Sequence, residues 1–259
     1  MRISAVSYLN TKPFIYGIFR GIMADQVEIS LDIPSVCAHK LLTGEADLAL
    51  APVAIIPELP EAWIVSDYCI GASGAVKTVC LYSEKPLSEI RQVYLDYHSR
   101  TSVELTRLLC AHFWKIQPEF IPAREGYISQ IQGDAAGLVI GDRTVGLEQK
   151  FEFVYDLGRA WVEWTGLPFV FAAWISTKPL DPGFIATFNG ALQSGLDHLP
   201  ELIKILPAIP GIDLDDYYRH NISYELDDNK WLGLNTFLTH IAGEKGYRMQ
   251  RQQSSLQIY

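Results

Sequence analysis

The chain contains little cysteine and no pattern that would join its cysteines into a site. Only four of the 259 residues are cysteine, and none forms a CxxC pair or stands at metal-ligand spacing from a histidine. Cys69, Cys80 and Cys110 lie in apolar runs, so we expect them to be buried free thiols. Buried free thiols suit a reducing compartment.

Runs of basic residues and long apolar stretches are also missing. The net charge is −9, the sequence pI is about 5.1 and no basic stripe is present, which argues against nucleic acid as the main partner. No uninterrupted apolar stretch is long enough to span a bilayer, so we expect no membrane partner. The first residues form a strand pattern instead of a basic segment followed by an apolar run. This pattern predicts no signal peptide and a cytoplasmic protein.

Several common catalytic and cofactor signatures are absent. The sequence has no GxSxG, no HExxH and no dinucleotide fingerprint. The glycine-bearing segment Gly71–Thr78 (GASGAVKT) fits neither GxGxxG nor a P-loop. Among the six histidines only His98 lies next to a candidate site residue, and a solvated loop histidine is the simpler interpretation of it. The sequence therefore predicts neither a metal nor a nucleotide or flavin cofactor.

What is present is an alternation of strand and helix patterns in the first third of the chain. Strands are predicted at residues 3–8, 27–33 and 46–51, and helices at 13–21 and 35–43. Ser35 is expected to cap the second helix and Gly44 to end it. Residues 64–82 are β-rich, with an interruption at residues 71–74.

A second unit of similar plan follows. Strands are predicted at residues 92–96, 120–122 and 138–140, and helices at 102–115 and 128–131. Residues 44–50 and 133–140 both read as a helix stop, an acidic turn and a buried strand, which suggests two similar α/β lobes. After Trp174 the pattern is helical, with helices expected at 182–199, 201–206 and 229–241.

These patterns predict two lobes with a cleft between them. A helical tail cannot bury itself alone, so we expect it to pack back onto the first lobe. The first lobe would then comprise residues 1–91 and 176–259, and the second lobe residues 92–175. The chain would cross between the lobes near residues 89–91 and 172–176, and two crossings imply a hinge.

Buried strands that stop at small polar residues mark the candidate site. The segment WTGLPFVFAAW, residues 164–174, is apolar and aromatic without a helical stripe, so it predicts a tight loop that feeds a buried strand. Three further segments combine a strand with an abrupt polar end: ISAVSYLNTKP at 3–13, VYLDYHSRTSVEL at 93–105 and LVIGD at 138–142. Strands that end together at one polar rim are typical of a small-molecule site.

The segment Ser99–Ser102 lies between a strand and a helix and has two interpretations. Thr101 with Glu104 fits a capping box, so the segment can be a plain helix cap. Alternatively, free N–H groups at the helix start join the hydroxyls of Ser99 and Ser102 in a cradle for a carboxylate or phosphate, without any lysine.

Three other loops offer candidate residues. Asn10 follows the first strand and can present a donor and an acceptor to the cleft, although its segment also fits a plain turn. Ser73 and Thr78 can reach a ligand if the glycine-bearing segment is more than a hairpin turn. Gly141 and Asp142 end a buried strand, and Asp142 is either a helix cap or a ligand acceptor.

Together, VSYLNTKP, SRTSVEL, LVIGD and WTGLPFVFAAW resemble the chorismate dehydratase family, whose members catalyse the first step of the futalosine route to menaquinone. The resemblance runs in order from Arg2 to about Trp174. It implies the fold of type II periplasmic binding proteins, with two α/β lobes around a cleft. The helical C-terminal tail fits the family less distinctively.

The resemblance also implies a reaction and a set of site residues. The reaction is the cofactor-free removal of water from chorismate to give 3-[(1-carboxyvinyl)oxy]benzoate. Asn10 would be the catalytic residue. The resemblance implies substrate binding by Thr78, Ser99, Thr101, Ser102 and Asp142. Ser73 and Gly141, which are predicted from their loops alone, complete the expected substrate-binding residues. Residue 78 is threonine where serine is expected in relatives, but the hydroxyl is kept.

Three other functions remain open. The same fold serves non-catalytic proteins that bind small carboxylates, although these are normally exported. A sibling enzyme of the pathway converts cyclic dehypoxanthinyl futalosine to a dihydroxynaphthoate, but its family opens with a Cys/Pro-rich loop and relies on a histidine. The third alternative is a cytoplasmic sensor domain that binds an acid and recruits a partner. The sequence gives no prediction of the oligomeric state.

Overall fold

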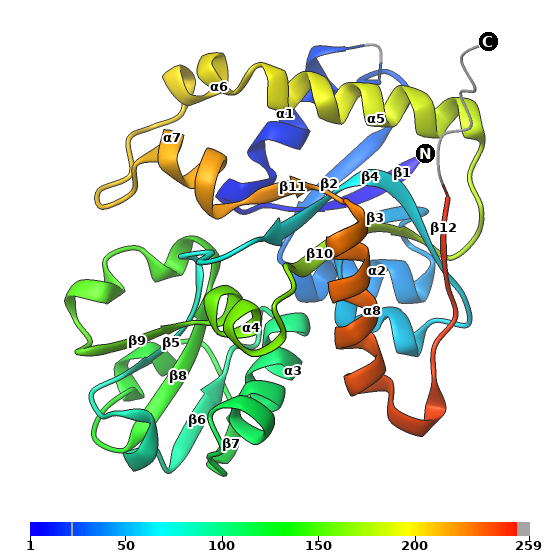
Figure 1. Cartoon of the computed structure of the whole chain (residues 1–259). Helices are drawn as coiled ribbons and strands as arrows, with labels where there is room; N and C mark the ends of the chain where they lie inside the picture. The colour runs from blue at the N-terminus through cyan, green and yellow to red at the C-terminus, as the bar shows by residue number, and fades with distance from the viewer. Residues whose placement is uncertain (22, 253–259) are drawn as a thin grey trace.

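The computed structural model describes residues 1–21 and 23–252, whose strands form two separate sheets (Figure 1). The first sheet has the order β11-β4-β10-β3-β1-β2, and β12 also pairs with β4. Its strands are β1 (Arg2–Val6), β2 (Glu28–Asp32), β3 (Leu48–Pro52), β4 (Ala62–Ala72), β10 (Phe169–Ser176), β11 (Ser223–Glu225) and β12 (Met249–Arg251). The second sheet has the order β7-β6-β8-β5-β9. Its strands are β5 (Val79–Ser83), β6 (Gln92–Leu95), β7 (Glu119–Pro122), β8 (Ala135–Ile140) and β9 (Phe153–Asp156).

Helices cover both sheets. The α-helices are α1 (Lys12–Arg20), α2 (Pro34–Thr43), α3 (Thr101–Leu108), α4 (Leu157–Thr165), α5 (Pro182–Asp197), α6 (Leu199–Ile205), α7 (Leu214–Asp216) and α8 (Asp228–Ala242). Two π-helical turns, η4 (Leu109–Phe113) and η8 (Tyr217–Asn221), continue α3 and α7. The 3₁₀ turns are η1 (Leu9–Thr11), η2 (Val53–Glu58), η3 (Leu87–Glu89), η5 (Tyr127–Gln130), η6 (Gly141–Thr144), η7 (Leu147–Gln149) and η9 (Gly243–Lys245).

The two sheets share one plan. In the first sheet β1 lies between β2 and β3 and is parallel to both, and in the second β6 lies between β7 and β8 in the same way. An antiparallel strand then follows in each, β10 beside β3 and β5 beside β8. The similar sequence patterns of residues 44–50 and 133–140 reflect this symmetry, because β3 and β8 occupy equivalent positions in the two sheets. The predicted two-lobed α/β fold is therefore confirmed.

The strand pairing corrects the expected crossing points. β5 pairs with β8 and β9 in the second sheet, and β10 pairs with β3 and β4 in the first. The chain therefore passes between sheets at residues 73–78 and 166–168, not near 89–91 and 172–176. All five residues of β5 and all eight of β10 are buried. A strand buried on both faces reads as a continuous apolar run, so its sequence pattern does not show which sheet it joins.

Most predicted helices and strands are present, with local differences. Gly44 ends α2 in the left-handed conformation, as expected, but Ser35 does not cap that helix. The helix starts with Pro34 after the extended residue Ile33, and no side chain caps it. β9 and α4, and also β11 and β12 in the C-terminal part, were not predicted from the sequence. Residues 253–259 of the predicted first lobe lie outside the described residues.

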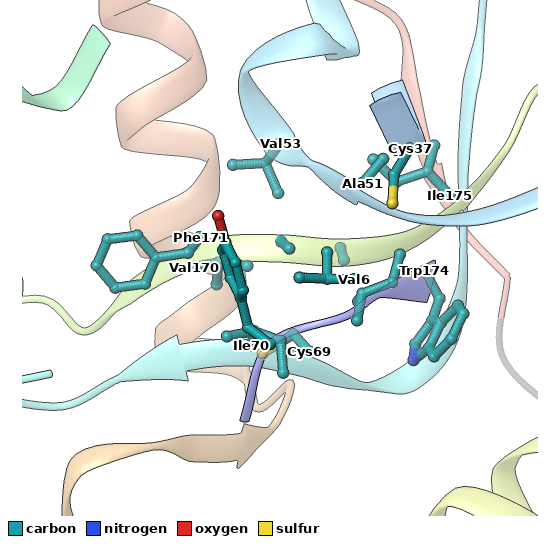
Figure 2. Close-up of a cluster of buried hydrophobic side chains, with 14 of the residues drawn as sticks. Val6, Cys37, Ala51, Val53, Cys69, Ile70, Val170, Phe171, Trp174 and Ile175 are labelled. Atoms are coloured by element: carbon teal, nitrogen blue, oxygen red, sulfur yellow. The ribbon is translucent and has the colours of Figure 1, made fainter. Parts of the chain in front are cut away.

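Strand β10 forms the centre of the core of the first lobe. Figure 2 shows Val170, Phe171, Trp174 and Ile175 of this strand among side chains from β1, β3 and β4. Trp174 packs edge-to-face on Phe188 of α5, with ring centroids 4.9 Å apart. All four cysteines are buried and free, which confirms the expectation for Cys69, Cys80 and Cys110.

Helix α5 of the C-terminal part packs closely on α1 (Figure 1). The contact depends on two glycines, because a Cβ on Gly17 would collide with the carbonyl oxygen of Ala191, and one on Gly195 would collide with that of Pro13. The tail is thereby joined to the first helix of the chain. Within the described residues, no helix combines the length and the apolar character that crossing a membrane requires.

This packing predicts opposite effects of two glycine substitutions in α5. Gly195→Ala forces the helices apart and should cost about 1–3 kcal/mol, as overpacking typically does. Gly190→Ala is the matched control, because no atom lies within 4 Å of its added Cβ. The control should gain up to about 1 kcal/mol from helix propensity. Thermal unfolding checks both, and equal melting temperatures for the two variants would contradict the glycine-mediated contact.

Candidate functional site

A cavity with about 500 Å³ of empty space, open solvent included, lies where the strands of the two sheets end. Both sheets supply its walls. The residues from the first sheet and its loops are Val6, Tyr8, Asn10, Pro34, Pro52, Ile70, Phe171 and Ala172. The residues from the crossing segment and the second sheet are Val76, Thr78, Val79, Ser99, Thr101, Ser102, Ile140 and Gly141.

The cavity brings together most of the residues predicted from the sequence. The predicted residues in its wall are Asn10, Thr78, Ser99, Thr101, Ser102 and Gly141. The wall does not include Ser73, which is exposed in the segment between β4 and β5. Asp142 is not part of the wall either, and its contact with the site is indirect.

A larger hollow, with about 1450 Å³ of empty space, open solvent included, lies against β5, β9 and α4. It shares Thr78 with the interlobe cavity, but none of the other predicted site residues lines it. Size alone therefore does not identify the site. The smaller cavity is the better candidate because polar groups from both lobes converge on it.

Asn10 lies in the 3₁₀ turn η1, directly after β1. Its side-chain oxygen Oδ1 accepts a hydrogen bond from Thr11 Oγ1 at 3.2 Å. Its Nδ2 donates to no other residue among those the structure describes. Asn10 therefore contributes a free amide donor to the wall of the cavity.

The start of α3 supplies three hydroxyl groups. Ser99 Oγ accepts a hydrogen bond from the N–H of Ser102 at 3.0 Å and thereby satisfies one N–H of the first helical turn. Thr101 Oγ1 accepts from the N–H of Ala54 at 3.2 Å, which links α3 to η2 of the first lobe. The expected capping box of Thr101 with Glu104 is therefore wrong, since Thr101 bonds across the lobes instead of within its own helix.

Thr78 approaches the cavity from the crossing segment that leads into β5. It is buried, and its Oγ1 lies 3.1 Å from the hydroxyl of Tyr217, where either oxygen can be the donor. The backbone carbonyl of Thr78 accepts from the N–H of Gly141 at 2.8 Å. The threonine thus connects the end of β8 to the C-terminal part of the chain.

The ring of Tyr8 packs against the backbone of Gly141. The φ of Gly141 is +65°, and a Cβ built on it would stand 2.6 Å from the ring of Tyr8. The hydroxyl of Tyr8 lies 2.5 Å from Nδ1 of His98, and the two rings are stacked. Tyr8 of the first lobe is therefore held by two segments of the second.

Tyr8 and His98 were not among the site residues predicted from the sequence. The interpretation of His98 as a solvated loop histidine is wrong, because the residue is half-buried and bonded to Tyr8. Its position beside Ser99 was the single signal in the sequence. Neither residue belongs to a recognisable pair, since they are 90 positions apart.

Protonation in this region follows from burial and from one ion pair. Asp96 is buried, pairs with Arg143 and accepts the N–H of His98 at 2.9 Å. Desolvation lowers the pKa of His98, and the charge of Arg143 lowers it further, while Asp96 acts in the opposite direction. Desolvation raises the pKa of Tyr8. A protonated Tyr8 hydroxyl therefore donates to the Nδ1 of a neutral imidazole.

Asp142 connects the lobes through the backbone. Its Oδ1 accepts the N–H of Leu9 at 3.1 Å. One side of the residue keeps access to solvent, but desolvation of the carboxyl raises its pKa, while the Leu9 N–H and the charge of Lys12 act to lower it. Asp142 thus holds the turn that carries Asn10. This role differs from both sequence interpretations of Asp142, a helix cap and a ligand acceptor.

The wall of the cavity is largely apolar, and its few polar groups are neutral. Among the described residues that line it, none is a lysine or an arginine. Donors are available from the Asn10 amide, the hydroxyls of Ser99 and Ser102, and the N-terminal end of α3, whereas the Thr78 hydroxyl is engaged by the Val76 carbonyl and by Tyr217. Such a set can bind a carboxylate through neutral hydrogen bonds and the helix dipole. Within residues 1–21 and 23–252 no three His, Cys, Asp or Glu side chains are grouped as metal ligands.

The fold and the interlobe cavity define a protein of the periplasmic-binding-protein fold. The alkanesulfonate-binding protein SsuA of Xanthomonas axonopodis pv. citri, solved with bound MOPS, is similar with a TM-score of 0.66 and 12% identity, covering 97% of this chain and 98% of that chain. Protein AF1704 of Archaeoglobus fulgidus is similar with a TM-score of 0.71 and 16% identity, over 94% and 97% of the two chains.

Sequence comparison then identifies the family. A family model described as menaquinone biosynthesis matches residues 1–243, so the chain belongs to this family. The chorismate dehydratase of Thermus thermophilus is 27% identical over 227 residues, which cover 79% of this chain and 83% of that protein. The family expected from the sequence motifs is thereby confirmed.

The contact between Gly141 and the ring of Tyr8 gives a testable prediction. Gly141→Ala and Gly146→Ala both place a side chain at positive φ, which costs roughly 1–2 kcal/mol. Only at Gly141 does the new Cβ also meet the Tyr8 ring, because nothing lies within 4 Å of a Cβ on Gly146. Gly141→Ala should therefore lower the free energy of unfolding by about 1–3 kcal/mol more than Gly146→Ala. Urea denaturation checks this, and a double variant with Tyr8→Ala should recover part of the difference.

The lowered pKa of His98 predicts a pH-dependent stability. As the pH falls below about 6.5, the unfolded chain binds a proton at this histidine before the folded chain does, so the folded state loses stability. His98→Gln should lose some stability at pH 8 through the Tyr8 contact. The difference in free energy of unfolding between parent and variant should shrink from pH 8 to pH 5. A difference that stays constant would show that the imidazole does not titrate as described.

Proposed function

We propose that this protein is a cytoplasmic lyase that removes water from chorismate and forms 3-[(1-carboxyvinyl)oxy]benzoate without a cofactor, as an early step of menaquinone biosynthesis. The observation that carries the proposal is the interlobe cavity, where the free Asn10 amide faces a set of neutral donors at the start of α3. The family and the similarity to a chorismate dehydratase support the same reaction.

The chemistry of chorismate suits such a cavity. Chorismate is a dicarboxylate with a non-aromatic ring, and loss of the ring C3 proton and the C4 hydroxyl makes the ring aromatic. The thermodynamic drive therefore comes from the substrate. The protein has to hold one geometry and place dipoles where charge develops. Ser99, Ser102 and the start of α3 would hold a carboxylate, and the Nδ2 of Asn10 would donate to a carboxylate or to the leaving hydroxyl.

The base is proposed to be the substrate itself. Among the described residues that line the cavity, none is Asp, Glu, His or Lys. The enolpyruvyl carboxylate of chorismate would accept the C3 proton, and the electron pair of that C–H bond would form the new ring double bond. The C4–O bond breaks as this double bond forms, and the hydroxide leaves as water after it takes up a proton equivalent to the one removed from C3. Asp142 stays outside this step, because its carboxylate is engaged with the N–H of Leu9.

The test is direct incubation of the purified protein with chorismate. Loss of chorismate and appearance of the aromatic product, followed by chromatography and absorbance, would support the proposal. Binding without turnover would instead favour a non-catalytic carboxylate-binding protein or a sensor domain. Turnover of cyclic dehypoxanthinyl futalosine alone would favour the sibling enzyme.

Asn10→Asp is the matching site variant. It keeps the oxygen that accepts from Thr11 but replaces the Nδ2 donor with negative charge near a dianionic substrate. Loss of a charge-assisted hydrogen bond costs about 1.5–3 kcal/mol, and repulsion adds to that cost. At about 1.4 kcal/mol per tenfold, kcat/KM should fall at least roughly a hundredfold. Asn229→Asp, an exposed position in the first turn of α8, controls for the added charge and should retain full activity.

A further inference from the structure

Three tyrosines of one short C-terminal segment reach the candidate site. Tyr217 and Tyr218 lie in η8, and Tyr224 lies in β11. All three are buried, with 2%, 1% and 7% of their surface exposed. Tyr217 contacts the hydroxyl of Thr78, and the other two contact the turn that carries Asn10.

The bonds of Tyr218 and Tyr224 go to consecutive backbone carbonyls. The Tyr218 hydroxyl donates to the carbonyl of Leu9 at 3.0 Å. The Tyr224 hydroxyl donates to the carbonyl of Asn10 at 2.8 Å. Both partners belong to η1, although they are 209 and 214 positions away from these tyrosines in the sequence.

These two carbonyls belong to the peptide planes on either side of the Asn10 Cα. Because a peptide unit is planar, fixing both planes fixes the φ and ψ of the residue between them. Asn10 lies in a three-residue turn with no strand ladder of its own. Within the turn, Thr11 Oγ1 donates to Asn10 Oδ1 and the N–H of Lys12 donates to the Leu9 carbonyl, and the two tyrosines add contacts from outside the turn.

The fold holds the tyrosines firmly. β11 pairs with β4, and the ring of Tyr224 packs edge-to-face on Phe14 with centroids 5.2 Å apart. The rings of Tyr217 and Tyr218 lie 5.5 Å apart within η8, a π-helical turn. Turns of this kind often occur at functional sites. Burial raises the pKa of Tyr218 and Tyr224, so both hydroxyls stay protonated and can donate.

We propose that Tyr218 and Tyr224 are positioning residues that fix the backbone of Asn10 and thereby aim its free amide donor into the cavity. The inference depends on the proposed function in one respect only, which is the identity of the reaction in which Asn10 takes part. The positioning itself concerns the chain without ligand, so it can be tested separately.

The first test is hydrogen exchange without substrate. Tyr218→Phe and Tyr224→Phe each remove one hydroxyl and keep the ring. Backbone amides in a peptide that covers residues 7–13 should exchange roughly two- to tenfold faster in both variants, as expected for a lost hydrogen bond. Tyr247→Phe is the control, since its hydroxyl bonds to Asn235 away from the cavity. Unchanged exchange in the two site variants would overturn the proposal.

The second test is kinetic. With chorismate as substrate, each site variant should lower kcat about tenfold or more and change KM by less than about threefold, because a misplaced group affects the reacting geometry more than binding. A double-variant cycle with Asn10→Ala shows whether the tyrosines affect kcat through Asn10. If the tyrosines act through Asn10, their effect on kcat should largely disappear in that background.

The outcomes separate the two proposals. If the parent protein does not convert chorismate but exchange in residues 7–13 rises as expected, the proposed function fails and the positioning stands. If the parent is active, exchange rises and kcat is unchanged, the tyrosines do not serve this reaction. An equal loss of kcat with and without the Asn10 side chain would show a general structural role and would also overturn the inference.

Discussion

The site depends on how the turn after β1 is held. The N–H of Leu9 bonds to Asp142, the carbonyls of Leu9 and Asn10 accept from Tyr218 and Tyr224, and the hydroxyl of Tyr8 bonds to His98. Two of these four contacts come from the second lobe and two come from the C-terminal part. The C-terminal contacts can persist when the lobes separate, because β11 pairs with β4 of the first sheet. The contacts of Asp142 and His98 require the lobes to be together.

Further hydrogen bonds between the lobes hold the wall of the cavity. Thr101 bonds to Ala54 across the lobes, and the N–H of Ser35 bonds to the carbonyl of His98. The start of α3 is thus anchored to the first lobe by the same segment that lines the cavity. A ligand held between Asn10 and α3 would gain interactions from both lobes only in the closed arrangement, which is how binding energy can favour closure.

Much of this site could be predicted from the sequence because its residues follow local rules. Buried strands that end at small polar residues predicted the loops, and the order of the motifs placed Asn10, Thr78 and the start of α3 around one cleft. Contacts set by distant packing could not be predicted. No local pattern joins Tyr224 to Asn10 or His98 to Tyr8, and the β-rich run at residues 64–82 gave no sign that its second half, β5, joins the other sheet.

The neutral character of the cavity has a chemical consequence under the proposed mechanism. An ammonium or guanidinium group beside a carboxylate lowers its pKa, because an opposite charge favours the ionised form. A substrate carboxylate paired in this way would be a weaker base toward the C3 proton. The described lining of the cavity contains no lysine or arginine, and Arg143 is paired with Asp96 outside it. Hydroxyl, amide and helix-end donors can orient a dicarboxylate while leaving one carboxylate basic enough to accept the proton.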